Sequence, residues 1–249
     1  MTQARISDLY ERYFAVVPAT RPELLDAAYA LRYQVYCVEH PFLDASQNPN
    51  GREVDRHDAH SVHAVLINKT NDEVVGCVRL VLPRSPAACS ELPMRELLGP
   101  DERARLDACD PMRTAEISRY AVSKTLRRRE GEELYPDVSL AGDDEDLPAD
   151  FRRLAPHISL GLLRGVATLA AEHGITTLCA AMAPSLLRLL KRFGLVFESL
   201  GPPIEYHGLR QPCIADCEAL LAGMAEKHSD YYHVVGAAYR GSKNPPAGA

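Results

Sequence analysis

Two runs rich in β-branched residues, separated by a short polar turn, constrain the fold of this chain most strongly. The first run covers residues 61–68 and the second covers residues 74–82, with Asn71 and Asp72 between them. Apolar strands joined by such a turn usually pair with each other, so they predict an antiparallel hairpin. In a third run, residues 115–122, apolar and polar side chains alternate, which predicts a strand with functional or packed side chains on both faces.

Helical patterns surround these strands. We expect helices over residues 21–38, 94–106, 156–173 and 184–193, and further strands over residues 175–182 and 195–199. Antiparallel pairing early in the chain and β-α-β alternation later predict an α/β fold of the mixed α+β kind. Its central sheet is mixed and covered by helices. The chain contains neither a G-x-G-x-x-G nor a G-x-x-x-x-G-K-[ST] motif, so it does not indicate a dinucleotide or P-loop site.

Length and composition indicate one globular unit. The chain has 249 residues, of which 46% are hydrophobic and 25% charged, so we expect a single domain over residues 1–240. The acidic stretch 130–150 is expected to be a mobile loop, and residues 241–249 a disordered tail.

Charge, cysteines and hydropathy exclude several classes of function. The formal net charge of -6 disfavours nucleic-acid binding, which depends on neutralising phosphates. The seven cysteines are scattered and form no C-x-x-C pair, which favours a reducing cytoplasm over a disulfide framework. The N-terminal region has no apolar run of the length that a signal peptide or spanning helix needs, so we expect a cytoplasmic protein with no membrane span.

Seven charged residues stand at the edges of predicted elements, several of them inside apolar sequence. A charge in partly buried space must be paired. The set contains four acids and three bases, which leaves one carboxylate without a fixed partner and free to receive a substrate ammonium. The seven residues are Arg32, Glu53, Asp55, Asp58, Arg79, Glu116 and Arg119.

These residues fall into four motifs, which occur in order along the chain. They are Arg32-x-x-Val35-Tyr36, Glu53-x-Asp55-x-x-Asp58, Gly76-x-x-Arg79-Leu80 and Glu116-x-Ser118-Arg119-Tyr120-Ala121-Val122. Together they resemble the acyl-homoserine-lactone synthases and, more closely, the N-acyl amino acid synthases, including the acyltransferases associated with PEP-CTERM/exosortase systems. This resemblance implies a GNAT-like acyltransferase fold, in which the strand with Glu116 and the strand 175–182 splay apart to admit a pantetheine arm.

The resemblance also implies a reaction. A long-chain fatty acyl group would pass from an acyl carrier protein thioester to the α-amine of an amino acid, giving an N-acyl amino acid. Glu116 would act as the base, Ser118 would hold the amine or a water, and Arg119 or Arg32 would bind the substrate carboxylate. The expected catalytic residues are Glu116, Ser118 and Arg119, and the expected substrate-binding residues are Arg32, Tyr36, Phe42, Glu53, Asp55, Asp58 and Arg79.

A carrier protein is a better acyl donor for this chain than coenzyme A. In coenzyme A-dependent relatives a loop rich in small residues binds pyrophosphate, but here Glu133 takes the last small-residue position after Arg128-x-x-Gly131. We expect the acidic carrier protein to dock on local basic runs. They contain Arg152, Arg153, Arg188, Lys191 and Arg192. No tightly bound cofactor is expected. We also expect no metal, because His57, His60 and His63 lie three apart in a loop that runs into a strand, a spacing that does not bring three ligands together.

Three other interpretations remain. A lactone synthase would use S-adenosylmethionine, although the chain has no Trp and Phe42 stands six residues after Tyr36, where those enzymes carry one. A non-catalytic lipid-binding protein could keep the fold without turnover. The charged network could also serve only to pin a helix onto the sheet.

Overall fold

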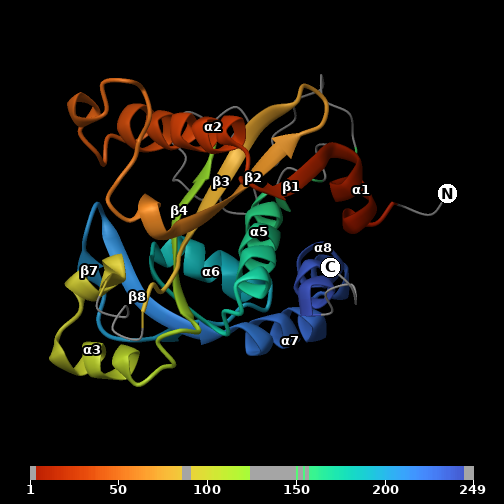
Figure 1. Cartoon of the computed structure of the whole chain (residues 1–249). Coiled ribbons are helices and arrows are strands. Elements are labelled where there is room, and N and C mark those ends of the chain that lie inside the picture. Colours follow the sequence, from red (N-terminus) through yellow and green to blue (C-terminus); the bar gives the residue numbers. More distant parts are fainter. Residues whose placement is uncertain (1–3, 86–90, 124–149, 151–153, 155–156, 244–249) are drawn as a thin grey trace.

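One sheet organises the molecule (Figure 1). The computed structural model describes residues 4–85, 91–123, 150, 154 and 157–243. Within them the strand order is β1-β2-β3-β4-β5-β8-β6, and β7 pairs with β8. Only the β4–β5 pair is parallel, which confirms the predicted mixed, mostly antiparallel sheet. The strands are β1 (Phe14–Pro18), β2 (Ser61–Asn68), β3 (Glu73–Val81), β4 (Thr114–Val122), β5 (Thr177–Met182), β6 (Glu198–Ser199), β7 (Ile204–Glu205) and β8 (Leu209–Asp216).

The helices begin where the sequence supplies suitable first residues. Proline, whose fixed φ suits the first turn, opens three of them, and the Asp216 side chain caps a fourth by accepting from the Ala219 amide. The described helices are α1 (Ile6–Tyr13), α2 (Pro22–Tyr33), α3 (Pro100–Asp107), α5 (Ser159–Glu172), α6 (Pro184–Arg192), α7 (Cys217–Lys227) and α8 (Ser229–Lys243). A π-helix, Gln34–Glu39, follows α2 directly, and short 3-10 turns cover Ala45–Gln47, Asp58–His60 and Pro93–Leu97.

Both faces of the sheet are covered, by α2 on one side and α5 on the other. Val65 of β2 packs in a cluster with Ala28 and Leu31 of α2. Its neighbour Leu66 belongs to the larger core cluster that includes Leu162 of α5. Because successive side chains of a strand point to opposite faces, these two clusters lie on opposite sides of the sheet.

Helix α5 approaches the sheet closely because glycines face it. A Cβ added at Gly165 would lie 2.8 Å from Cβ of Ala64, and one added at Gly161 would lie 2.7 Å from Cδ1 of Leu66. The hydroxyl of Tyr10 fills the remaining space beside Gly161 and donates to the Ile158 carbonyl oxygen at 2.8 Å. The contact therefore joins α1, α5 and the sheet.

Strands β4 and β5 pair only over a short length. Their register ends at Glu116 opposite Cys179, yet β4 continues to Val122 and β5 to Met182. Beyond that point β5 stays paired with β8, so β4 and β5 diverge. The predicted splay between the strand with Glu116 and the next strand is confirmed, and Glu116 stands at its apex.

A β-bulge in β4 follows within three residues. Ser118 pairs with Arg79 and Ala121 with Cys77, so two residues of β4 oppose Val78 alone. Arg119, one of the two, has a φ of 48°, a left-handed conformation that is strained for a residue with a long side chain.

The structure differs from the sequence-based expectations at several elements. The expected helix 21–38 is an α-helix that becomes a π-helix at Gln34–Glu39, and the expected strand 195–199 is paired only at Glu198–Ser199. Strand β8 was not expected, because Pro212 and the polar residues around it break the strand pattern. The expected single domain over residues 1–240 stays a prediction, and α8 continues to Lys243. The acidic loop lies outside the described residues apart from Asp150.

Gly161→Ala tests the close approach of α5. An alanine in a helix is ordinarily more stable than a glycine, but here its methyl group meets Tyr10 and Leu66. We expect the free energy of unfolding to fall by about 1–3 kcal/mol in urea denaturation. Glu172→Ala, at the exposed end of the same helix, is the control. A Gly161→Ala protein as stable as wild type would contradict this packing.

Candidate active site

Three arginines and three carboxylates form a closed ring of ion pairs beneath α2. Going round the ring, each arginine stands between two acids and each acid between two arginines. Every link lies between 2.6 and 3.0 Å. The order is Arg32, Glu53, Arg119, Asp55, Arg79, Asp58 and back to Arg32.

Arg32 anchors the ring from α2. Its side chain has no exposed surface, and its guanidinium donates to Glu53 at 2.6 Å and to both oxygens of Asp58 at 2.7 and 3.0 Å. His63 of β2 approaches Asp58 Oδ1 at 3.1 Å. Burial opposes ionisation of Asp58, but its hydrogen bonds with His63 and Arg32 hold its pKa far below the usual range. Asp58 is therefore ionised.

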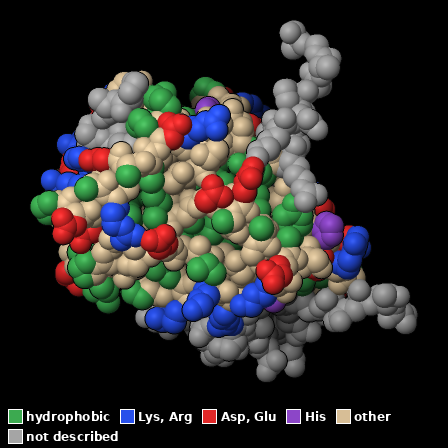
Figure 2. Space-filling model, turned by 90° about the horizontal axis from the view of Figure 1, so that it is seen from below, with side chains coloured by type: hydrophobic (Ala, Val, Ile, Leu, Met, Phe, Trp, Pro, Cys, Tyr) green, Lys and Arg blue, Asp and Glu red, His purple; other side chains and the backbone are tan. Residues whose placement is uncertain are grey.

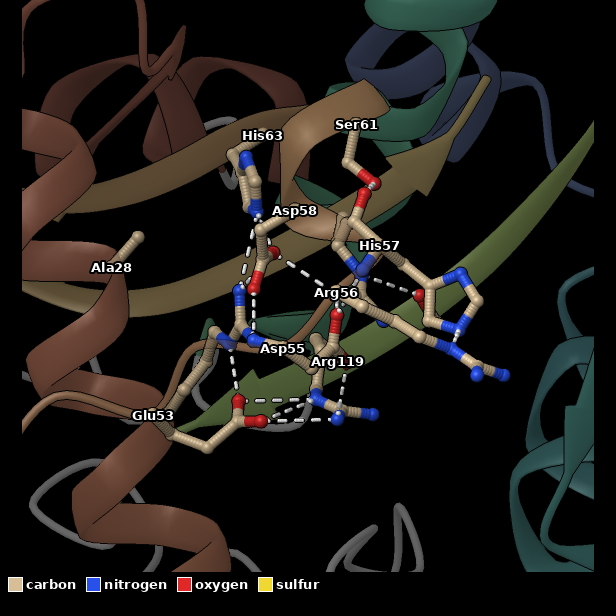
Figure 3. A network of polar contacts seen from close by, with 12 residues as sticks. Ala28, Glu53, Asp55, Arg56, His57, Asp58, Ser61, His63 and Arg119 are labelled. Atoms are coloured by element: carbon tan, nitrogen blue, oxygen red, sulfur yellow. Dashed lines mark hydrogen bonds and ion pairs between the residues drawn. The ribbon is translucent and has the colours of Figure 1, made fainter. Parts of the chain in front are cut away.

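Arg79 and Arg119 close the ring from the sheet. Arg79 Nη1 donates to Asp55 at 2.6 Å and to Asp58 at 3.0 Å, while its Nε donates to the Ser118 hydroxyl at 2.9 Å. Arg119 donates to both oxygens of Glu53 and to Asp55, as Figure 3 shows. Burial would raise the pKa of Glu53, but the charges of Arg119 and Arg32 lower it below the usual range.

Backbone contacts position the acidic segment between α2 and β2. The Glu53 amide donates to the Tyr29 carbonyl of α2 at 3.1 Å. The Asp55 amide donates to Asp58 Oδ2 at 2.7 Å, and the His57 amide donates to Asp55 Oδ1 at 2.8 Å. The E-x-D-x-x-D spacing therefore lets a single turn present all three carboxylates to the arginines.

Glu116 stands outside the ring. Its side chain is 4% exposed, and its Oε2 accepts from the Met94 amide at 2.8 Å. Among the described residues no Lys, Arg or His forms an ion pair with it. Burial raises the pKa of Glu116 to about 8, although the Met94 amide and the charges of Arg79 and Arg119 act in the opposite direction. The count of four acids against three bases thus identifies a real feature, and the acid without a cation is Glu116.

A cavity of about 440 Å³ opens at the apex of the splay, and both polar and apolar side chains line it. Its polar wall includes Asp55, Arg79, Glu116, Ser118 and Arg119. Its apolar wall comes from β5, α5, α6 and the segment before β6. The apolar residues include Leu163, Met182, Leu186, Leu190 and Phe197. The arrangement brings a carboxyl of high pKa next to room for an apolar chain.

The π-helix contributes the aromatic part of the cavity wall. Tyr36 lies within it, and the Arg119 guanidinium stacks over the Tyr36 ring at 5.8 Å. Phe42 follows a few residues later and also lines the cavity. Short π-helical segments often occur at functional sites, because they shift side chains out of α-helical register.

The structure separates the predicted site residues into two groups. Tyr36, Phe42, Asp55, Arg79, Glu116, Ser118 and Arg119 line the cavity. Arg32, Glu53 and Asp58 lie in the ring behind it, so their guanidinium and carboxylate groups hold other residues of the protein. Arg32 in particular is fully buried, which excludes direct contact with a substrate carboxylate.

Three of the five predicted carrier-docking residues lie within the described part of the chain and two do not. Arg188, Lys191 and Arg192 lie exposed on α6. Lys227 of α7 joins them, because its Nζ donates to the Lys191 carbonyl at 3.1 Å. Arg152 and Arg153 lie outside the described residues.

Sequence reasoning missed two contributors to the site. The Met94 amide, which donates to Glu116, is a backbone group in a 3-10 turn, so the type of side chain at this position does not predict the contact. Arg210 lines the cavity from β8, a strand that was itself not expected.

The absence of a metal site stays a prediction. Within the described part of the chain, no group of three or more His, Cys, Asp and Glu side chains is arranged to hold a metal ion. His63 contacts Asp58 in the ring, and His57 lines the cavity. No helix among those described combines the length and apolar character needed to cross a bilayer.

Comparison with known proteins agrees with this geometry. Residues 31–136 match the family model described as acetyltransferase (GNAT) domain. That segment carries all seven charged residues of the four motifs, the bulge and the apex of the splay. The chain has the GNAT acyltransferase fold. No curated protein matches it in sequence.

Solved structures share this GNAT fold over most of the chain. The coenzyme A-dependent acyl-homoserine lactone synthase BjaI has a TM-score of 0.59 and 19% identity, covering 91% of this chain and 98% of its own. The N-acyl amino acid synthase FeeM, from uncultured soil microbes, has a TM-score of 0.55 and 15% identity, and the match covers 87% of this chain and 97% of FeeM. The AHL synthase LasI has a TM-score of 0.54 and 18% identity, and the match covers 82% of this chain and 89% of LasI. The predicted relationship to these synthases is confirmed at the level of fold.

Arg32→Gln tests the ring. The substitution leaves Glu53 and Asp58 short of a buried cation, so we expect the free energy of unfolding to fall by about 3 kcal/mol or more in urea denaturation. Arg52→Gln, which breaks the exposed pair with Asp26, is the matched control and should change stability little. Equal effects of the two substitutions would show that the ring contributes no more than a surface pair.

Proposed function

We propose that this protein is an N-acyltransferase that moves a fatty acyl group from a thioester donor to the α-amine of an amino acid. One observation carries the proposal: a buried carboxyl, which has no cation partner among the described residues, lines a cavity together with a set of apolar side chains. An amine nucleophile needs the first feature, and a fatty acyl chain needs the second.

Glu116 is suited to remove the proton of an ammonium substrate. The α-amino group of a peptide titrates near pH ~8 and that of a free amino acid titrates higher, so the substrate arrives mostly protonated at neutral pH and cannot attack a thioester. A pKa of about 8 for Glu116 lies much closer to this range than the pKa of an ordinary glutamate, which lowers the cost of proton transfer. In the free protein Glu116 holds a proton at neutral pH. The arriving ammonium supplies the missing cation, so Glu116 releases that proton to solvent and its carboxylate then accepts one from the ammonium. The neutral amine attacks the thioester carbonyl, the C–S bond breaks as the amide bond forms, and the departing thiolate takes the second proton that the nitrogen loses.

The splayed strands supply the place for the thioester. Past Glu116 and Cys179, the edge of β4 that faces β5 has no strand partner among the described residues, so its backbone groups can bond the pantetheine arm and the oxyanion. The acyl chain would extend along Leu163, Met182 and Leu186. A small apolar cavity of about 40 Å³ also borders on Ile117, Leu163 and Phe197, and it offers space for a longer chain.

An acyl carrier protein is the donor that the surface favours. Helix α6 has two roles, because Leu186 and Leu190 line the cavity while Arg188, Lys191 and Arg192 face outward. In Figure 2, which shows one face of the molecule, Lys and Arg side chains form a row along the lower border of that face. An acidic carrier bound at α6 would therefore deliver its arm close to the splay.

The alternative acceptor is S-adenosylmethionine, which is also an α-amino acid. BjaI, which shares the fold, is described with that compound and isopentyl-CoA bound. The same deprotonation at Glu116 would serve either acceptor. The two reactions differ in their products, so the activity measurement decides between them.

Loss of Glu116 tests the proposed reaction. Thiol release from long-chain acyl carrier protein is measured with no acceptor, with a pool of amino acids and with S-adenosylmethionine, followed by mass spectrometry of the lipid extract. We expect amino-acid-dependent thiol release and a new amide mass, with a rate at least about 100-fold lower in Glu116→Gln. Glu172→Gln, an exposed carboxylate on α5, should match wild type.

Each of the other outcomes would contradict part of the proposal. A lactone product formed only with S-adenosylmethionine would identify the alternative enzyme. Thiol release without an amide would indicate a hydrolase. Lipid bound without any release would indicate a non-catalytic binding protein.

Charge reversal on α6 tests the carrier surface. We expect Arg188→Glu combined with Arg192→Glu to raise KM for acyl carrier protein about tenfold or more, because both positions then repel the acidic carrier. The rate with a small acyl thioester of pantetheine should stay unchanged. An equal loss with both donors would mean that the substitutions damage the enzyme itself.

A further inference from the structure

Arg210 is the one cavity-lining arginine whose charge the described residues leave unbalanced. Four arginines line the cavity. Arg56 pairs with Glu96, Arg79 with Asp55 and Asp58, and Arg119 with Glu53 and Asp55. Arg210 donates to the Leu209 carbonyl at 3.1 Å, and among the described residues it pairs with no carboxylate.

The β7–β8 hairpin holds Arg210 in place. Arg210 pairs with Ile204 across the hairpin, whose tight turn includes His207 at a φ of 50° and Gly208 at a φ of 88°. A Cβ at Gly208 would lie 3.4 Å from Arg210 Nη1, so the turn packs against the guanidinium. The Arg210 guanidinium also lies over the ring of Phe42, 5.7 Å from its centroid. The aromatic contact and the turn keep the cation at the cavity wall.

A planar guanidinium without an acid is suited to bind a carboxylate through two parallel hydrogen bonds. The two arginines expected from the sequence to bind a carboxylate already pair with carboxylates of the protein. Arg32 is buried in the ring, and Arg119 donates to Glu53 and Asp55. We infer that Arg210 binds the α-carboxylate of the acceptor, while Glu116 receives its α-ammonium. The assignment rests on the proposed function.

This arrangement defines the class of acceptor. Among its described residues the cavity lining offers one acid without a cation and one arginine without an acid, a pair that complements the two charges of a zwitterionic α-amino acid. Simple alkylamines and amino acid amides lack the second charge. The enzyme should therefore select free α-amino acids, with either an ordinary side chain or the sulfonium of S-adenosylmethionine.

Binding of two product probes tests the inference without relying on turnover. The probes are N-dodecanoylglycine and N-dodecanoylglycinamide, which share the acyl chain and differ in one charge, and calorimetry gives their Kd values. We expect wild type to bind the acid about 10- to 100-fold more tightly, the range for hydrogen bonds to a charged group. In Arg210→Gln this preference should fall to about one, through weaker binding of the acid alone. Arg210→Lys should retain part of it.

Turnover supplies the second measurement. With a pool of amino acids and the matching α-carboxamides as acceptors, Arg210→Gln should raise KM for the acids and leave the rate with the amides unchanged. Arg5→Gln, which removes an equal charge from an exposed pair on α1, is the control and should keep the preference of wild type.

Three outcomes would overturn the inference. They are equal affinity of wild type for both probes, no binding of either probe, and an unchanged preference in Arg210→Gln. If wild type prefers the acid probe and Arg210→Gln does not, but wild type forms no amide, the carboxylate site stands and the proposed reaction fails.

Discussion

The ring of six alternating charges is the interaction on which the rest of this structure depends. It joins α2, the acidic turn before β2, and strands β3 and β4, and four of its six side chains are almost completely buried. Such charges are tolerable inside a protein only when each has a partner of opposite sign at hydrogen-bond distance. The ring meets this condition at every link. Because it is closed and balanced, it leaves no charge to neutralise Glu116.

The isolation of Glu116 follows from where β4 leaves β5. Glu116 occupies the last paired position of that parallel ladder, and the bulge at Arg119 follows immediately. Arg119 adopts a strained backbone conformation there and directs its guanidinium into the ring, not toward Glu116. The same few residues of β4 therefore open the cavity, complete the ring and leave an uncompensated acid at the apex. The proposed chemistry depends on this coincidence.

Much of this arrangement could be predicted from the sequence, because it depends on contacts between residues that are close together in the chain. The hairpin of β2 and β3 follows from two β-branched runs and a polar turn, and the spacing of the E-x-D-x-x-D motif gathers three acids into one turn. Counting charges also predicted one spare carboxylate. What the sequence did not show depends on contacts between distant segments. Arg32 is buried because it pairs with Glu53 and Asp58, which come from a later segment of the chain. Arg210 lies on β8, and this strand is hard to predict because it contains Pro212.

We infer that Glu116 keeps a proton at neutral pH, because burial disfavours its charged form and no cation among the described residues pairs with it. The direct measurement is a carbon-13 NMR titration of the Glu116 carboxyl carbon in the free protein, assigned by its loss in Glu116→Gln. We expect a midpoint near pH 8, with the group neutral below and ionised above. Adding a zwitterionic amino acid should lower the midpoint, because its ammonium stabilises the carboxylate. A midpoint near 4.5, the ordinary value for a glutamate, would show that Glu116 is ionised at neutral pH and holds no proton for this chemistry.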